Sequence, residues 1–172
     1  VSKAAKDEIV RRYYAGLVSM KTAVGSEETV RKLELLMKQA GISTDYRKVV
    51  AAADERATQT GEPAAAIQLE DGRIIVGRTS PLLGASAAVL LNALKALGNI
   101  DDEIHLLSPL IIAPIQHLKI DHLGNQNPRL HTDEVLLALS ICAATNPTAE
   151  LAMQQLSKLK NCQVHSSVIL SA

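Results

Sequence analysis

The sequence predicts an α/β protein, in which a three-helix segment over residues 1–62 precedes a layered domain with a mixed sheet over residues 63–172. Apolar residues recur at spacings of three and four through the first segment, whereas strand-like and helix-like runs alternate through the second. Composition changes at the same place, near Gly61-Glu62-Pro63. Residues 1–62 hold 11 of the 18 basic residues, 9 of the 18 acidic residues and all three tyrosines.

Three helices are expected in the first segment, because each apolar run is bounded by capping residues. Ser26, followed by two glutamates, is a good N-cap that also complements the helix dipole. Gly41 suits the left-handed residue that ends a helix. The expected helices span residues 9–24, closed by Gly25; 26–40; and from Ser43 or Thr44 to about Thr58.

The second segment begins with a β-hairpin signal. Asp71-Gly72 separates two apolar runs and predicts a type I′ turn, with positive φ at both central positions. The order of patterns after it is β-β-α-β-α-α-α-β. The expected strands are 64–69, 73–79, 104–107 and 164–170, and the expected helices run from Ser80-Pro81 to Leu97, then over 110–121, 132–145 and 148–159.

Composition excludes several classes of function. The 18 basic and 18 acidic side chains give no net charge, which argues against a nucleic-acid surface. The chain has no Phe and no Trp, which argues against base-stacking platforms. Apolar stretches are interrupted before the ~18 residues that a membrane span requires.

Cellular location and completeness are predicted from the cysteines and the chain ends. Cys142 and Cys162 have no paired spacing, so we expect free thiols in a cytoplasmic protein. No signal peptide opens the sequence. The chain starts without Met and stops within an apolar run, so we expect a piece of a longer polypeptide, truncated at the C-terminus of the second domain.

A binding site for an anion is predicted where two Ser-Pro dipeptides follow strands. Ser80-Pro81 and Ser108-Pro109 both suit helix starts, whose free N–H groups favour anions. If the two ends converge, Gly84 and Ser86 would lie on the wall of a polar pocket. Arg78 belongs to a stretch, residues 73–99, that contains bases but no acid. There are alternative explanations without a ligand. The two Ser-Pro dipeptides can be ordinary helix caps, and the stretch without acids can be a buried helix that contains few charges.

The polar stretch from Asn125 to His131 supplies the other candidates. Loops carry function more often than cores do, so Asn127, Arg129 and His131 are candidate ligand contacts, with Asp133 just beyond them. A solvated connector followed by a helix N-cap is the alternative interpretation.

No metal or cofactor is expected. His117 and Asp121 are four residues apart on a predicted helix, but no recognised ligand pattern includes them. His105 and His165 fall in predicted strands and are interpreted as sheet residues. No nucleophile elbow and no glycine-rich phosphate loop occur in the chain.

Several stretches of the sequence resemble the C-terminal part of an uncharacterised bacterial family, domain of unknown function eighteen-forty-six. The resemblance covers nearly the whole chain. It implies an upstream domain, because full-length members of this family carry a Gly-Pro-Gly-Ser-Gly-Lys loop there, and no nucleotide-binding residue transfers to this chain. The matching stretches are Asp7–Tyr14, Met37–Ser43, Gly84–Ala87, Asn127–Val135 and Leu139–Pro147.

The layout of the second domain is more distantly similar to cytidine deaminases. The hairpin ends in Gly77, a small-residue helix start follows at Gly84-Ala85-Ser86, and a later strand ends at Ser108-Pro109. The deaminase zinc ligands and catalytic glutamate have no counterpart among residues 85–88 or at Leu110 and Ala113. The resemblance therefore implies a deaminase-like fold without its zinc chemistry.

Two functions follow from these patterns. The first is a module that binds a small anion, or that packs against an upstream domain and forms homo-oligomers through residues 1–62, with the tyrosines as anchors. The second is an enzyme whose active site is completed by the upstream domain, with Arg129, His131 and Asp133 at the junction. In either case we expect no activity from this chain alone.

Overall fold

The computed structural model describes residues 2–169, and within that range it contains seven α-helices and one three-stranded sheet. Three shorter helical turns, η1 (Thr44–Tyr46), η2 (Leu118–His122) and η3 (Leu156–Leu159), connect them. The strands are β1 (Ala64–Gln68), β2 (Ile74–Arg78) and β3 (Gln163–Ser166). The helices are α1 (Lys3–Lys21), α2 (Glu27–Ala40), α3 (Lys48–Thr60), α4 (Ala85–Gly98), α5 (Pro109–His117), α6 (Thr132–Ala143) and α7 (Pro147–Gln154).

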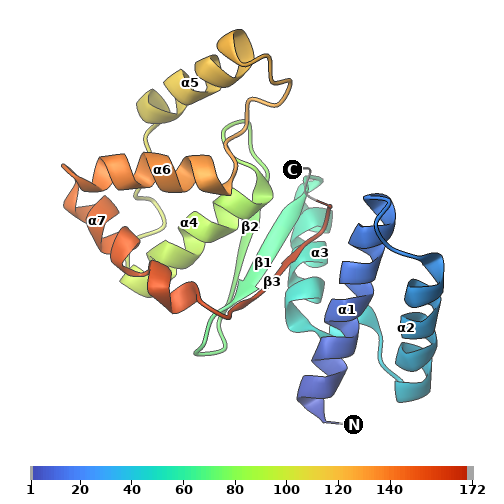
Figure 1. Cartoon of the computed structure of the whole chain (residues 1–172). Helices are drawn as coiled ribbons and strands as arrows, with labels where there is room; N and C mark the ends of the chain where they lie inside the picture. The colour runs from blue at the N-terminus through green and yellow to red at the C-terminus, as the bar shows by residue number, and fades with distance from the viewer. Residues whose placement is uncertain (1, 170–172) are drawn as a thin grey trace.

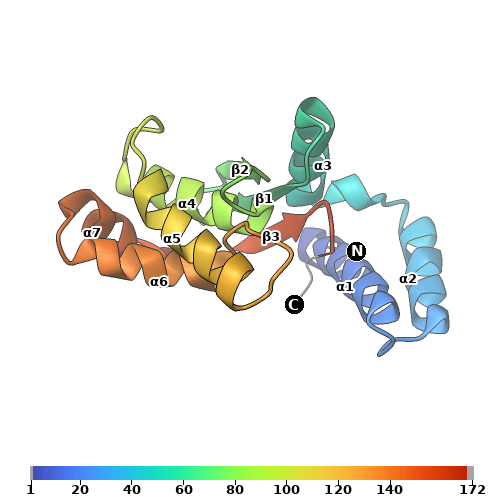
Figure 2. The same ribbon diagram turned by 90° about the horizontal axis from the view of Figure 1, so that it is seen from above.

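The sheet lies between two helical layers (Figure 1). Its strand order is β2-β1-β3, and both pairings are antiparallel, so the expected mixed sheet is wrong for the described residues. Antiparallel pairing follows from the short hairpin that joins β1 to β2. Helix α4 packs on one face and α3 on the other, while α5, α6 and α7 lie beyond α4 (Figures 1 and 2).

Helices on both faces of the sheet explain why β1 is apolar from Ala64 to Ile67. Ala65, Ile67 and Leu69 pack towards α4, in a cluster with Val89 and Ala93. Ala66, on the opposite side, packs against Val49 and Ala53 of α3. Because β1 is the central strand and helices cover both of its faces, its side chains from Ala64 to Ile67 are apolar on both faces. Small alanines allow both helices to approach closely.

The hairpin is present, but its turn is not of type I′. The N–H of Gly72 donates to the carbonyl of Leu69 (2.9 Å), and the N–H of Leu69 donates to the carbonyl of Arg73 (2.9 Å). Gly72 alone carries a positive φ, 88°, while Asp71 does not. This is the three-residue connection with a glycine bulge. The Asp71 carboxylate instead accepts from the Arg73 N–H at 3.0 Å.

The expected strand at 104–107 is wrong, since these residues form an irregular segment. Leu106 and Leu107 are buried in the main core cluster without pairing to any described strand. The ammonium of Lys95 donates to the carbonyl of Asp102 (2.8 Å), which fixes the start of this segment against α4. A short apolar run predicts burial here, and burial is satisfied by a loop.

Helix boundaries also differ from the expected ones. The third helix starts at Lys48, after the turn η1, so neither Ser43 nor Thr44 caps it. The first ends before Gly25, with Thr22 as its C-cap. The expected helix 148–159 divides into α7 and η3, and the last strand ends at Ser166. Leu170, where that strand was expected to end, lies outside the described residues. Gly41 has the expected left-handed conformation, with φ of 62°.

One helix from the residues before 63, α3, packs directly on the sheet. The helices α1, α2 and α3 share an apolar cluster that includes Val10, Met37 and Val50, against which the three partly buried tyrosines pack. The predicted boundary at residues 62 and 63 stays a prediction. No helix within residues 2–169 is long and apolar enough to cross a membrane.

Gly77 sets the closest approach between the sheet and α4. A Cβ added there would lie 2.3 Å from the backbone N of Val89 and 2.7 Å from the carbonyl carbon of Ala88. Backbone atoms cannot move aside as a flexible side chain can. We therefore expect Gly77→Ala to lower the free energy of unfolding by about 3 kcal/mol, at the upper end of overpacking costs. Urea denaturation measures this change.

Gly84→Ala is the matched control, because the nearest atom to its added Cβ is the Leu130 carbonyl oxygen at 3.7 Å and its φ is −70°. We expect this control to stay within ~0.5 kcal/mol of the parent protein. An equal, small effect of both substitutions would contradict the close packing of β2 on α4.

Candidate functional site

Leu130 joins two loops that are far apart in the sequence. Its N–H donates to the carbonyl of Leu82 (2.9 Å), and its carbonyl accepts from the N–H of Gly84 (3.1 Å). These bonds form a parallel bridge between Leu83 and Leu130. The Leu130 side chain is fully buried in the main core. Because Gly84 caps α4 and Leu130 directly precedes the cap of α6, the bridge brings the N-termini of these two helices together.

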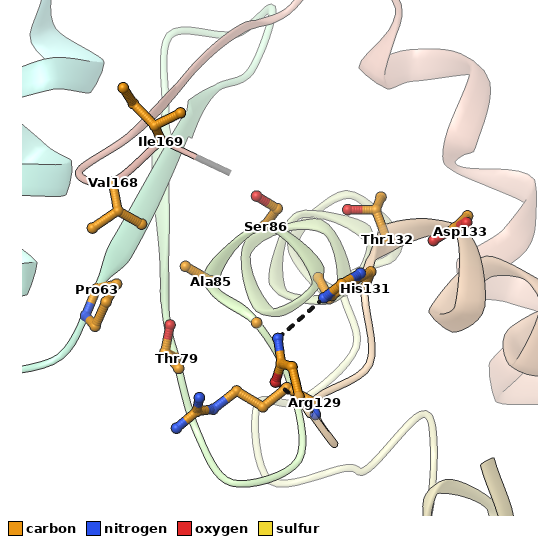
Figure 3. Close-up of a pocket in the computed structure, with 13 residues that line it drawn as sticks. Pro63, Thr79, Ala85, Ser86, Arg129, His131, Thr132, Asp133, Val168 and Ile169 are labelled. Atoms are coloured by element: carbon orange, nitrogen blue, oxygen red, sulfur yellow. Dashed lines mark hydrogen bonds between the residues drawn. The ribbon is translucent and has the colours of Figure 1, made fainter. Parts of the chain in front are cut away.

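A cavity of about 500 Å³ opens at this junction (Figure 3). One side is the first turn of α4, another is the loop that leads into α6, and the third comes from the sheet and the segment after β3. The residues that line it are Pro63, Thr79, Gly84, Ala85, Ser86, Ala87, Asn127, Arg129, His131, Thr132, Asp133, Val168 and Ile169.

The structure gathers six of the nine candidate residues around this cavity, although no observation tests whether they bind a ligand. Gly84 and Ser86 come from the start of α4, and Asn127, Arg129, His131 and Asp133 come from the loop and the first turn of α6. The remaining three, Arg78, Ser80 and Ser108, are not among the lining residues.

Ser80-Pro81 does not start a helix, so this prediction is wrong. The Ser80 hydroxyl accepts from the N–H groups of Leu82 (3.3 Å) and Leu83 (3.1 Å), and the resulting turn delays α4 until Ala85. Ser108 is the N-cap of α5, with Pro109 in its first turn as expected. The two dipeptides therefore differ, and only Ser108-Pro109 begins a helix.

The loop before α6 is exposed over residues 125–128 and is hydrogen-bonded within itself and to Ser80, so both interpretations of it, as a ligand-binding loop and as a solvated connector, stay predictions. The guanidinium Nε of Arg129 donates to the carbonyl of Ser80 (2.9 Å), and the Arg129 N–H donates to the amide oxygen of Asn127 (3.1 Å). The Asn127 amide nitrogen lies 3.3 Å from Nε2 of His131 (Figure 3). Only Nε of the guanidinium is occupied among the described residues, which leaves both terminal nitrogens of Arg129 for a ligand.

Lys119 and Glu134 bind the backbone of this loop, and neither was among the candidate residues predicted from the sequence. Lys119 is 3% exposed, and its ammonium donates to the carbonyl of Arg129 (2.7 Å) and to Oε2 of Glu134 (2.8 Å). The same Glu134 oxygen accepts from the His131 N–H at 2.7 Å. A glutamate three residues after an N-cap is a recognisable signal. The buried lysine comes from η2 and has no local signature.

The first turn of α4 borders the cavity and contains backbone N–H groups without intrahelical partners. The first turn of a helix leaves N–H groups without intrahelical partners, and here they belong to Ala85, Ser86 and Ala87. No side chain caps α4, and its first turn contains no acid. In α6, by contrast, Asp133 and Glu134 lie in the first turn and offset part of the positive end of that helix. The stronger attraction for an anion is therefore at α4.

No group of three metal-ligating side chains occurs within residues 2–169. His117 and Asp121 form an ion-pair contact on the exposed side of α5 and η2, and the ring of His122 packs edge-on against that of His117. These residues lie outside the cavity. Cys142 and Cys162 are free, as expected.

Comparison with known proteins identifies the family. The family model described as Domain of unknown function DUF1846, C-terminal, matches residues 45–172. The chain belongs to this family. It is 55% identical over 170 residues to a UPF0371 protein of Corynebacterium urealyticum, which covers 99% of the chain and 34% of that relative. It is 50% identical over 169 residues to a UPF0371 protein of Streptococcus pyogenes serotype M5, covering 98% and 34% respectively. The chain thus spans about a third of the length of these relatives, and the resemblance to this family is confirmed.

Removal of the buried ammonium should disrupt the floor of the site. We expect Lys119→Met to lower the free energy of unfolding by about 3 kcal/mol, because it leaves the Glu134 carboxylate without its cation. Adding Glu134→Gln should recover part of this loss, since the amide keeps the bond to the His131 N–H without a charge. Urea denaturation of the two single variants and the double variant measures the coupling.

Lys160→Met is the control, because Lys160 is exposed and has no ion pair among the described residues. We expect its effect to stay within ~0.5 kcal/mol. If the losses in Lys119→Met and Glu134→Gln simply add, the two side chains do not act as a pair.

Proposed function

We propose that the cavity between α4 and α6 binds a small organic phosphate. The observation that supports this most strongly is the convergence of two helix N-termini on one cavity, next to the free end of an arginine. Backbone N–H groups at a helix start bind phosphate oxygens, and a guanidinium adds a charge-assisted pair of bonds. The phosphate would accept from Ala85, Ser86 and Ala87, with Arg129 opposite.

Thr79 supports this proposal independently of the helix ends. Its side chain lines the cavity and is only 8% exposed, yet its hydroxyl has no hydrogen-bond partner among the described residues. Its backbone N–H is already used by the Pro63 carbonyl at 2.7 Å. The hydroxyl oxygen itself is open to solvent through the cavity, where a ligand can reach it. A ligand oxygen would satisfy it.

The size and the walls of the cavity indicate the rest of the ligand. About 500 Å³ is more than a phosphate needs and falls within the usual range of small-molecule sites. Pro63, Val168 and Ile169 form an apolar side, and no Tyr lines the cavity within the described residues. A nucleobase would therefore have only the His131 ring and the Arg129 guanidinium to stack on. A sugar phosphate, with hydroxyls for Ser86 and Thr132, suits this lining better than a nucleotide.

The test is a titration of the protein with inorganic phosphate, ribose 5-phosphate and an adenine nucleotide at constant ionic strength. We expect the sugar phosphate to raise Tm most, by the linkage of binding to stability. Isothermal titration calorimetry should show binding about tenfold weaker for Arg129→Gln, since a charge-assisted bond is lost. Arg78→Gln removes an exposed arginine outside the cavity and should bind as the parent does.

Absence of any stabilisation by all three anions would overturn the proposal. Equal weakening by Arg78→Gln and Arg129→Gln would mean that only the general positive potential is sensed.

An enzyme completed by an upstream domain is the alternative function. His131 and Asp133 are exposed at the rim of the cavity, where a second part of a longer polypeptide could reach them. This alternative requires phosphate-ester turnover in the full-length protein that is lost in His131→Ala. Binding of the ligand to this chain without such turnover favours the first proposal.

We also propose four finer features that the sequence predicts: the type of fold, the cellular location, the absence of nucleic-acid binding and the protein partners. The hairpin of β1 and β2, followed by the small-residue helix α4 packed on the sheet, supports a deaminase-like layer without zinc chemistry. The two free cysteines support a cytoplasmic location. The balanced charge supports the absence of nucleic-acid binding. Contact with an upstream domain, and homo-oligomers through residues 1–62, are proposed as its protein interactions.

A further inference from the structure

A second cavity, of about 550 Å³, lies between α1 and β3. It is separated from the first by the segment after β3, because Val168 and Ile169 line both. Its polar groups are those of Arg11, Tyr14, Arg47, Asp54 and His165, with serines from the end of β3. None of these residues contributes to the proposed phosphate site.

Arg47 is the unusual member of this group, because it is a buried cation without a counterion. It is only 6% exposed, and its Nε donates to the amide oxygen of Gln163 at 3.1 Å. No carboxylate lies within ion-pair distance of it among the described residues. Burial lowers the pKa of its guanidinium, and Asp7 and Glu8 oppose this from α1. The terminal nitrogens of Arg47 have no protein partner among the described residues and are open to solvent in the cavity, so an anion can bind there in place of water.

The other charged groups around the cavity do not supply that anion. Arg11 is already bound by Glu8, through Nε and Nη2 at 2.7 Å each. His165 packs edge-on against Tyr14, with ring centroids 4.4 Å apart, and burial lowers its pKa so that the ring stays neutral near pH 7. Asp54 is exposed on α3 and lines the cavity without an ion pair among the described residues.

We propose that this second cavity binds the carboxylate of a small aliphatic acid, with Arg47 as the carboxylate-binding residue. One free guanidinium matches one carboxylate through two parallel hydrogen bonds. The Asp54 carboxylate, which lines the cavity, disfavours a doubly charged phosphate more than a single carboxylate, and none of the described residues that line the cavity belongs to the first turn of a helix. The aliphatic part would pack on Leu17, Val18, Val168 and Ile169, whose side chains form the apolar walls.

4-Methylpentanoate is the probe, and 4-methylpentanamide is its neutral match of the same shape. We expect the acid to bind with a Kd of about 1 mM by isothermal titration calorimetry, as suits so few ligand atoms. The amide should bind at least about tenfold more weakly, because it cannot form the charged pair. The NMR signals of the imidazole of His165 should shift with the acid and not with the amide.

Four variants test whether 4-methylpentanoate binds next to Arg47. Arg47→Gln should weaken binding of the acid about tenfold, and Arg47→Lys should fall between. Lys48→Gln, an exposed neighbour, should bind as the parent does. Asp54→Asn should strengthen binding a few-fold, since a repelling charge is removed. Because Asp54 is exposed, this variant remains informative even if the arginine variants fail to fold.

Equal binding of the acid and the amide, or unchanged binding in Asp54→Asn, would overturn the proposal. Arg129→Gln should leave 4-methylpentanoate binding unchanged. A loss in that variant would place the acid in the phosphate cavity and overturn the second site, whatever the fate of the first.

Discussion

The backbone pairing of Leu130 with the loop before α4 is the constraint on which the site depends. Leu130 exchanges hydrogen bonds with Leu82 and Gly84, and its side chain is fully buried in the core. This pairing fixes the start of α6 against the start of α4, in addition to the packing of both helices in the main core. Two backbone bonds and one buried leucine therefore convert two separate helix ends into a single polar surface.

Lys119 extends the same constraint to the loop that carries the candidate residues. Its ammonium is held by the Arg129 carbonyl and by Glu134, and Glu134 also holds the His131 N–H. A buried ammonium with two oxygen partners is fixed by its own desolvation cost, because no other position satisfies it. The guanidinium of Arg129 is thus positioned through its backbone as well as through its bond to Ser80.

Local signals in the sequence predict much of this protein, and distant contacts explain where prediction fails. The hairpin at Gly72, the cap at Ser26 and the left-handed Gly41 depend on neighbours in sequence, so they could be read directly. Asn127 and Arg129, which line the cavity, could be proposed as candidates because polar loops stand out between apolar helices. By contrast, Thr79 lines the cavity only because segments about fifty residues apart in the sequence meet, as in the bond from Arg129 to Ser80. Lys119 bonds to residues 10 and 15 positions further along the chain, and no local pattern signals these bonds. The prediction that Ser80-Pro81 starts a helix was wrong because a serine hydroxyl, which can cap a helix, can also accept hydrogen bonds from the N–H groups of a short turn.

The two cavities share Val168 and Ile169, so the segment after β3 forms a common wall. On one side free N–H groups and Arg129 favour phosphate, and on the other Arg47 faces acidic neighbours and favours a single carboxylate. In the two proposals, the cavities differ in the number and type of donors that each offers to an anion. This difference is set by helix α4 on one face of the sheet and by α3 and α1 on the other.

The most direct measurement of the central claim is an NMR titration of the backbone amides with ribose 5-phosphate. If α4 and α6 bind one anion together, the amides of Ala85, Ser86 and Ala87 and those of Thr132 and Asp133 should shift along one binding curve with a single Kd. The Gly84 and Leu130 amides should stay slow to exchange with solvent throughout. Shifts at only one helix start, or two different curves, would contradict a site built by the pairing of Leu130.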